Sequence, residues 1–108
     1  MYLNLNNQKI EISLANNLSL RLWGLMGKKN ITKGILFPRC NAIHTFFMKE
    51  EIDVVALNEH NEVIAIYPRV SKNKIIKIKN KAKKTSILEL PKDTSYSLKI
   101  GSIIQFIL

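Results

Sequence analysis

The stretch that decides the fold class runs from Val54 to Tyr67 and reads VVALNEHNEVIAIY. Two apolar runs, 54–57 and 63–67, flank the polar segment 58–62. Branched apolar runs on either side of a short polar segment are typical of a β-hairpin with a four- or five-residue loop. Pro68 has no amide hydrogen to donate, so we expect it to end the second strand.

Other short apolar segments extend this β pattern in both directions. Apolar residues alternate over residues 3–14 around a polar Asn-Asn-Gln, which predicts an N-terminal hairpin. Residues 35–37 and 42–49 are apolar or aromatic and predict two further strands, the second placing His44, Phe46 and Met48 on one face. A lysine-rich strand around 77–83 and a closing apolar strand at 102–108 complete the pattern.

One segment follows a helical period instead. Leucines and a methionine recur every three or four residues over about residues 17–26, and Gly27 follows as a helix stop. We therefore expect an α+β domain that is mostly β, a compact curled sheet or small barrel with this one N-terminal α-helix. Residues 1–108 are expected to form a single domain.

Composition excludes several classes of protein. The chain has 108 residues, of which 46% are hydrophobic and 23% charged, as in ordinary globular domains. Its apolar runs are far shorter than the roughly 18–20 residues that span a bilayer, and the N-terminus shows no secretory signal. We expect no transmembrane segment and a cytoplasmic protein. The single cysteine, Cys40, excludes an internal disulfide and a cysteine-rich zinc site.

Positive charge is concentrated in the second half of the chain. The formal net charge is +9, and residues 63–108 carry ten basic and two acidic side chains. A candidate basic patch comprises Lys72, Lys74, Lys77, Lys79, Lys81, Lys83 and Lys84. Such a patch attracts polyanions or an anionic surface, but an exposed lysine row also prevents strands from pairing edge to edge. Because 14 of the 17 basic residues are lysine, nucleic acid is the less favoured partner.

Polar side chains within apolar sequence mark the candidate site. Arg21, His44 and Asp53 each have apolar neighbours, and such groups are usually paired when buried. Two interpretations remain open. The three residues form either a polar network that joins helix to sheet, or a pocket for a small polar or anionic ligand.

A catalytic alternative involves Cys40 and His44. They would form a nucleophile–base pair if Asp53 oriented the imidazole. No cysteine-hydrolase signature surrounds Cys40, and residues four apart in a strand lie roughly 13 Å apart, so the chain would have to bend. No spacing specifies a zinc site and no glycine-rich phosphate loop is present, so we expect neither a metal nor a cofactor.

Several ordered blocks resemble one family. They read RLWGLMG (21–27), GILF (34–37), HTFFMK (44–49), IDV (52–54), LELP (88–91) and IG (100–101). Over about residues 10–108 the chain is similar to the bacterial and archaeal family called domain of unknown function 192. The resemblance implies a compact, mostly β domain and no established activity. Its motif residues correspond to Arg21, Gly24, Leu25, Met26, His44, Met48, Asp53 and Glu89.

The chain also departs from the family pattern. Glu51 stands where relatives commonly have a proline, and Asp93 where they have a glycine after Leu-Pro. Aspartate tolerates left-handed backbone, so we expect that turn to be kept. The lysine-rich stretch 68–84 matches poorly.

These observations favour a non-enzymatic binding or accessory module. Its candidate ligand-binding residues are Arg21, His44, Met48, Asp53 and Glu89. One alternative is a small hydrolase that uses His44 and Asp53. The other is an electrostatic adaptor that binds polyanions or anionic surfaces through residues 72–84.

Overall fold

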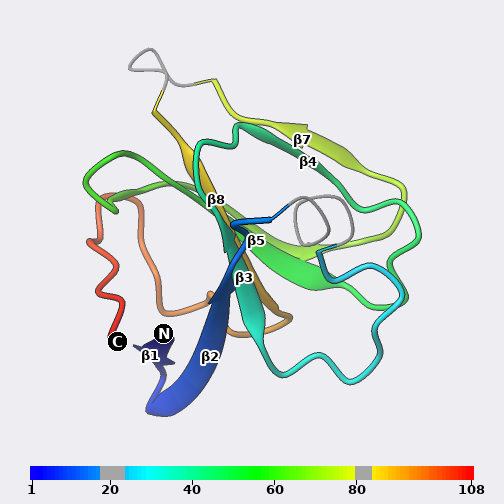
Figure 1. Ribbon diagram of the computed structural model, residues 1–108, viewed down its shortest axis with the longest axis horizontal. Coiled ribbons are helices and arrows are strands. Elements are labelled where there is room, and N and C mark those ends of the chain that lie inside the picture. Colours follow the sequence, from blue (N-terminus) through cyan, green and yellow to red (C-terminus); the bar gives the residue numbers. More distant parts are fainter. Residues whose placement is uncertain (18–23, 80–83) are drawn as a thin grey trace.

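The computed structural model describes residues 1–17, 24–79 and 84–108, and within these ranges it contains strands and no helix (Figure 1). The strands are β1 (Tyr2–Leu5), β2 (Gln8–Leu14), β3 (Gly34–Phe37), β4 (Ala42–His44), β5 (Ile52–Leu57), β6 (Val63–Val70), β7 (Ile75–Lys77) and β8 (Ser86–Pro91). No described segment is a helix capable of crossing a bilayer.

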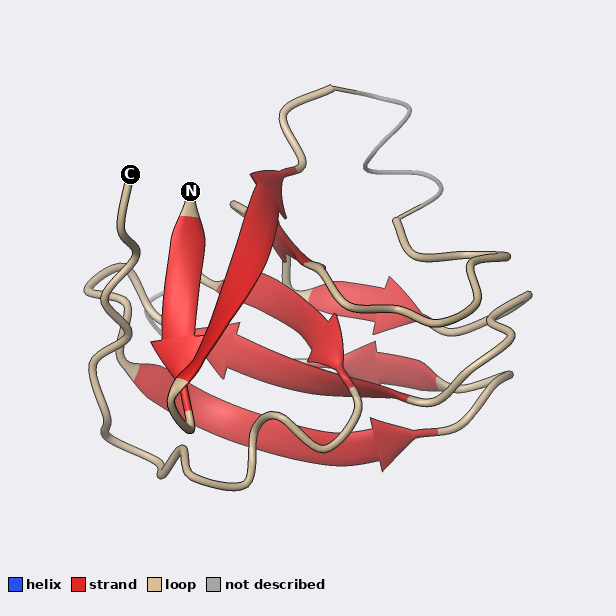
Figure 2. Cartoon of the chain, turned by 90° about the horizontal axis from the view of Figure 1, so that it is seen from below, coloured by secondary structure: helices blue, strands red, loops and turns tan. Residues whose placement is uncertain are grey.

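Six strands form one curled sheet in the order β1-β2-β3-β8-β5-β6. Its described pairings are antiparallel except that of β2 with β3. β4 and β7 form a separate two-stranded antiparallel sheet, seen at the upper right in Figure 1. A bridge between Tyr2 and Ile107 places the two chain ends side by side, as Figure 2 also shows.

The large sheet is covered on both faces, so it contributes to two hydrophobic clusters. On one face, which we call the small-sheet side, Val54 and Ile87 pack with Ile43 of the two-stranded sheet. On the opposite face, the terminal side, Leu88 packs with residues near the chain ends such as Ile104. Because successive side chains alternate across a strand, β5 and β8 supply both clusters and are buried along most of their length.

The two predicted hairpins and the predicted C-terminal turn are confirmed. β5 and β6 pair antiparallel as expected from the central stretch. At the N-terminal hairpin, Asn6 and Asn7 have φ of 54° and 62°, as a two-residue hairpin turn requires. Asp93, with φ of 64°, takes the left-handed position expected of it after Leu-Pro.

The expected α+β class is wrong, because the described chain is all-β. Most of the helix expected over about residues 17–26 falls on residues 18–23, which lie outside the described residues. Residues 24–27 form a turn instead of a last helical turn, and Gly24 and Gly27 have left-handed φ of 50° and 72°. The amide of Gly27 donates to the carbonyl of Phe47 at 3.1 Å, so a tertiary contact holds this turn.

The expected strand over 42–49 is also wrong beyond His44, where β4 ends. Phe47 has a left-handed φ of 63°, which breaks the alternation of an extended strand. Pro68 does not end β6, which continues to Val70. β6 lies at the sheet edge and its register with β5 shifts between Ile52 and Val54, so the ladder requires no amide from Pro68.

The two other expected strands are shorter than predicted. Of the lysine-rich strand expected around 77–83, the described residues place Lys77 in β7 and leave 78–79 outside a strand, and residues 80–83 lie outside the described residues. The C-terminal segment 102–108 makes isolated bridges rather than a strand.

Candidate functional site

A cavity of about 100 Å³ lies on the small-sheet side, between the large and the small sheet. The large sheet, the segment around β4 and the turn 24–27 all contribute to its wall. Its lining includes Met26, Phe37, Cys40, His44, Met48 and Glu89. His44 is exposed, so the cavity meets solvent at this side chain.

Glu89 supplies the carboxyl group of the cavity. It lies on β8 opposite Ile35 of β3 and Val54 of β5, and it is 5% exposed. Its Oε1 atom has no hydrogen-bond partner within the described part of the chain. Burial raises the pKa of Glu89 from its ordinary 4.5 to about 7, because removal from water disfavours the charged form. A buried polar atom without a partner destabilises the fold, and a ligand that donated a hydrogen bond would remove that penalty.

His44 and Cys40 also line the cavity. The His44 ring stacks on Phe46 with ring centroids 5.1 Å apart. The Cys40 thiol donates to the carbonyl oxygen of Ala42 at 3.1 Å. Cys40 precedes β4 and His44 ends it, and both residues line the same cavity. The thiol is thereby directed to the backbone, and no described contact joins it to the imidazole.

Asp53 has a different environment on the terminal side of the sheet. It is 1% exposed, and its carboxylate accepts five hydrogen bonds. The shortest are from Ser95, at 2.9 Å from the amide and 2.7 Å from the hydroxyl. Further amides of Arg69, Asp93 and Thr94 complete the set at 3.0–3.3 Å. Asp53 therefore fastens the turn after β8 to the sheet.

The predicted site residues are thus only partly brought together. His44, Met48 and Glu89 line one cavity. Asp53 faces the other side of the same sheet, since it lies opposite Leu90 whereas Glu89 lies opposite Val54. Arg21 lies outside the described residues. Asp53 is consequently not placed to orient His44.

The charge of the lining limits which ligand fits. Glu89 is its carboxylate, and no lysine or arginine among the described residues lines the cavity. Nor does the described part of the chain gather three or more His, Cys, Asp or Glu side chains in a metal-binding arrangement. Among the described residues, the lining therefore offers the Glu89 carboxyl as an acceptor for a positively charged or neutral hydrogen-bond donor.

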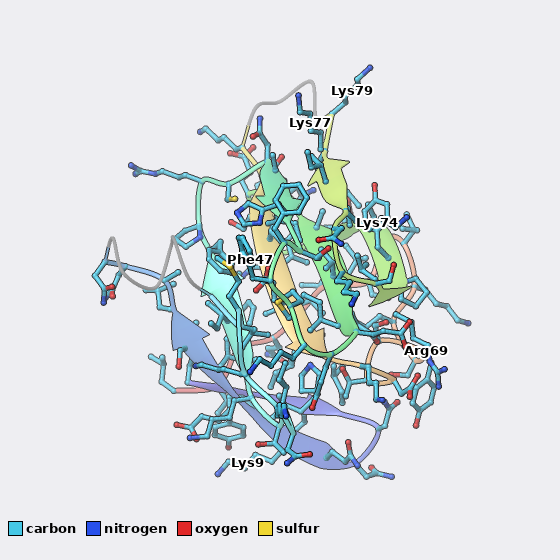
Figure 3. All side chains as sticks on the ribbon, turned by 90° about the vertical axis from the view of Figure 1, so that its right-hand side faces the viewer. Lys9, Phe47, Arg69, Lys74, Lys77 and Lys79 are labelled. Carbon is cyan, nitrogen blue, oxygen red and sulfur yellow. The ribbon has the colours of Figure 1, made fainter. Side chains whose placement is uncertain are left out.

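The candidate basic patch is divided by the fold. Lys72, Lys74, Lys77 and Lys79 are exposed, and Figure 3 shows Lys77 and Lys79 at the top of the view, above Phe47 and Lys74. Lys84 instead pairs with Glu59 at 3.2 Å, at the loop between β5 and β6. Lys81 and Lys83 lie outside the described residues.

Phe37 was not assigned to the site from the sequence. In the sequence, Phe37 is one apolar residue of a short strand. The register of β3 with β8, which the sequence does not reveal, places it near Glu89. The available signal for Glu89 itself was its position within LELP. A carboxyl group between two leucines must face either solvent or a special environment.

Comparison with known proteins identifies one family. The sequence model of domain of unknown function 192, DUF192, described as "Uncharacterized ACR", matches residues 1–106. No match was found among curated proteins.

Two solved structures share the fold. One is a protein of unknown function from Novosphingobium aromaticivorans, with 13% identity over 97% of this chain and 82% of that chain, and a TM-score of 0.76. The other is a putative transcription regulator from Sinorhizobium meliloti, with 18% identity over 96% of this chain and 89% of that chain, and a TM-score of 0.75. At these identities the likeness is one of fold alone.

Proposed function

The chain belongs to the domain of unknown function 192 family, and we propose that it is a binding module whose cavity beside Glu89 receives a small hydrogen-bond donor group. The observation that carries this proposal is the buried Oε1 atom of Glu89, which lacks a partner in the described part of the chain and belongs to a residue that lines the cavity. Native proteins satisfy nearly all buried polar atoms, and the exceptions often mark functional sites.

The size of the cavity restricts the ligand. Its volume of about 100 Å³ is smaller than the roughly 150 Å³ of an engineered cavity that binds benzene. The occupant is therefore a molecule of a few heavy atoms, or the end group of a larger one that extends past exposed His44. Phe37 and Met48 offer apolar contact to a short carbon chain, so an alkylammonium or amide end group fits best.

Binding is favoured over hydrolysis by the placement of the polar groups. A hydrolase built on His44 requires a group that holds the imidazole, and Asp53 is engaged by five donors on the other side of the sheet. The Cys40 thiol is bonded to a backbone carbonyl. The Oε1 atom of Glu89, in contrast, accepts no hydrogen bond from the described residues and is available to a donor group of a ligand.

The test is an NMR titration of the isotopically labelled protein with ethylammonium, acetamide and acetate, each up to about 100 mM, since ligands this small bind weakly. We expect ethylammonium to shift the amide signals of Cys40, His44 and Glu89, acetamide to shift them less, and acetate to leave them unchanged. The titration is made at about pH 8, where a carboxyl group of pKa about 7 is mostly charged, and its attraction for the cation predicts this order.

Two variants locate the site. Glu89→Gln keeps the shape but loses the charge, so ethylammonium shifts should vanish while acetamide shifts persist. Glu11→Gln removes a carboxylate on β2 whose side chain is 63% exposed, and it should change nothing. Equal shifts with acetate, or the absence of any shift at Cys40, His44 and Glu89, would overturn the proposal.

A further inference from the structure

Phe46 and Phe47 form the tip of the loop between β4 and β5, and this tip exposes apolar surface. Phe47 is 79% exposed and Phe46 is 36% exposed. Ile75, at the start of β7 and opposite His44 in the small sheet, is 62% exposed. Isolated exposed apolar residues are ordinary, but three of them on the first residue of β7 and on the turn that follows its partner strand β4 mark a contact surface.

The tip is held by the neighbouring loop between β6 and β7. Thr45 is fully buried, and its hydroxyl donates to the carbonyl of Ser71 at 2.7 Å while accepting from the amide of Lys74 at 2.9 Å. The Thr45 amide donates to the Lys74 carbonyl at 2.9 Å, and the Asn73 amide donates to the Thr45 carbonyl at 3.2 Å. These four bonds place the lysines of one loop beside the phenylalanines of the other.

The charge around the tip is predominantly positive. The exposed lysines of the two loops and of β7 are Lys49, Lys72, Lys74 and Lys77. Two acidic residues also lie nearby. The Glu50 carboxylate accepts hydrogen bonds from the amides of Asn30 and Ile31, and Glu51 is half-buried. The two loops and β7 therefore carry solvated ammonium groups in the same region of the fold as the small apolar centre, and Figure 3 labels Phe47, Lys74 and Lys77 among these residues.

Phe47 is an unfavourable residue for this position in the isolated protein. Its φ of 63° is left-handed, a region that glycine and asparagine tolerate and bulky residues avoid. Its ring is also largely in water. Both features disfavour phenylalanine in the free fold, so an external contact is the physical reason to place it there.

We propose that this tip docks onto an anionic lipid bilayer, with Phe47 and Ile75 entering the interface while the surrounding lysines meet anionic headgroups. Exposed aromatic residues next to lysines combine the apolar and electrostatic contributions that hold proteins at such surfaces. Single-stranded nucleic acid is the less favoured partner. Ile75 has no ring on which a base could stack, and one face of the Phe46 ring already contacts His44.

The test is vesicle flotation. One vesicle population contains roughly 30% phosphatidylglycerol in phosphatidylcholine and the other is pure phosphatidylcholine, because the anionic lipid alone creates the surface potential. We expect the protein to float with the first population and not with the second, and to be released as salt rises from about 0.1 M to about 0.5 M.

Phe47→Asn suits the left-handed backbone and should still fold, yet lower the partition coefficient about tenfold. The double variant Lys72→Glu/Lys74→Glu should lower it more, because each lysine contributes about fivefold and the new charges repel the surface. Matched controls are Tyr96→Ala, which removes a 75% exposed aromatic ring from the loop after β8, and exposed Lys99→Glu; both should bind as the unaltered chain does.

Several outcomes would overturn the proposal. They are absence of flotation with anionic vesicles, equal binding to neutral vesicles, or an equal loss from Tyr96→Ala and Phe47→Asn. Polyuridylate that bound more tightly than the vesicles, and lost affinity in Phe47→Asn, would assign the tip to nucleic acid instead. Glu89→Gln should leave flotation unchanged, so this result is independent of the cavity.

Discussion

Replacing Glu89 by glutamine should abolish a loss of stability that develops as the pH rises. Burial raises the pKa of Glu89 from 4.5 to about 7 in the folded state. The folded protein therefore binds more protons than the unfolded chain between these two values, and stability falls as pH increases through that range. Below about pH 4 the carboxyl is neutral in both states and the penalty is absent.

The magnitude follows from the two pKa values. Each tenfold change in a protonation equilibrium corresponds to about 1.4 kcal/mol, so the unaltered protein should lose about 3 kcal/mol of unfolding free energy between about pH 4 and pH 8 on account of Glu89. Glutamine has nearly the same shape and does not titrate. The difference in unfolding free energy between Glu89→Gln and the unaltered protein should grow by about this amount over the same range.

The assay is urea denaturation followed by far-ultraviolet circular dichroism at a series of pH values. Other titrating groups cancel, because only the difference between the two proteins is plotted against pH. Glu11→Gln removes an exposed carboxylate that pairs with Lys33 at the surface, so its difference curve should vary by less than about 1 kcal/mol. A flat difference curve for Glu89→Gln would refute the reasoning, since it would mean that the Glu89 carboxyl is as well solvated in the folded protein as in the unfolded chain.

Three further changes test other parts of the structure. Asp53→Asn should destabilise the protein by about 3 kcal/mol in urea denaturation, because an amide nitrogen would face donors from Ser95 and its neighbours; a loss below about 1 kcal/mol would contradict the five-bond arrangement. Gly34→Ala should cost about 3 kcal/mol in the same assay, because a Cβ there would lie 2.6 Å from the Glu89 carbonyl oxygen, which the sheet holds in place; an unchanged midpoint would refute this. Phe47→Asn should raise the melting temperature by a few degrees in calorimetry, because asparagine relieves the left-handed strain; a lower melting temperature would show that Phe47 packs against the fold.

Sequence periodicity predicted the parts of the fold whose reasons are local. The hairpin of β5 and β6 follows from two branched apolar runs around a polar loop, and the N-terminal hairpin from alternation around Asn6 and Asn7. The left-handed turn at Asp93 follows from the tolerance of that residue. In each case a few adjacent residues determine the outcome.

Periodicity failed where distant segments determine the backbone. Residues 42–49 have strand composition, but the hydrogen bonds of Thr45 with Ser71 and Lys74 turn the chain after His44. The turn at Gly27 is likewise tied to the carbonyl of Phe47. Such contacts leave no period in the sequence, because the partners are separated by twenty residues or more.

The same limit applies to the candidate site. His44 and Asp53 both have apolar neighbours in the sequence, which predicted that they would be buried and paired. Asp53 is buried and fully engaged, whereas His44 is exposed. Which face of the sheet each residue occupies depends on strand register, and that places Asp53 and Glu89 on opposite sides. Glu89 entered the candidate set through family resemblance, since its alternation with Leu88 and Leu90 is also that of an ordinary half-exposed strand.

The two faces of the large sheet therefore differ in how their buried carboxyl groups are satisfied. On the terminal side, the buried carboxylate of Asp53 is satisfied by backbone and side-chain donors, and it stabilises the turn after β8. On the small-sheet side, the Glu89 carboxyl lacks a partner for Oε1 among the described residues, and the loop that follows β4 of the small sheet carries the exposed, left-handed Phe47. Both features lower the stability of the free protein. A donor group bound in the cavity would relieve the first, and a lipid surface at the tip would relieve the second. Proteins retain such features where function requires them, so we infer that the small-sheet side is the working face of this fold.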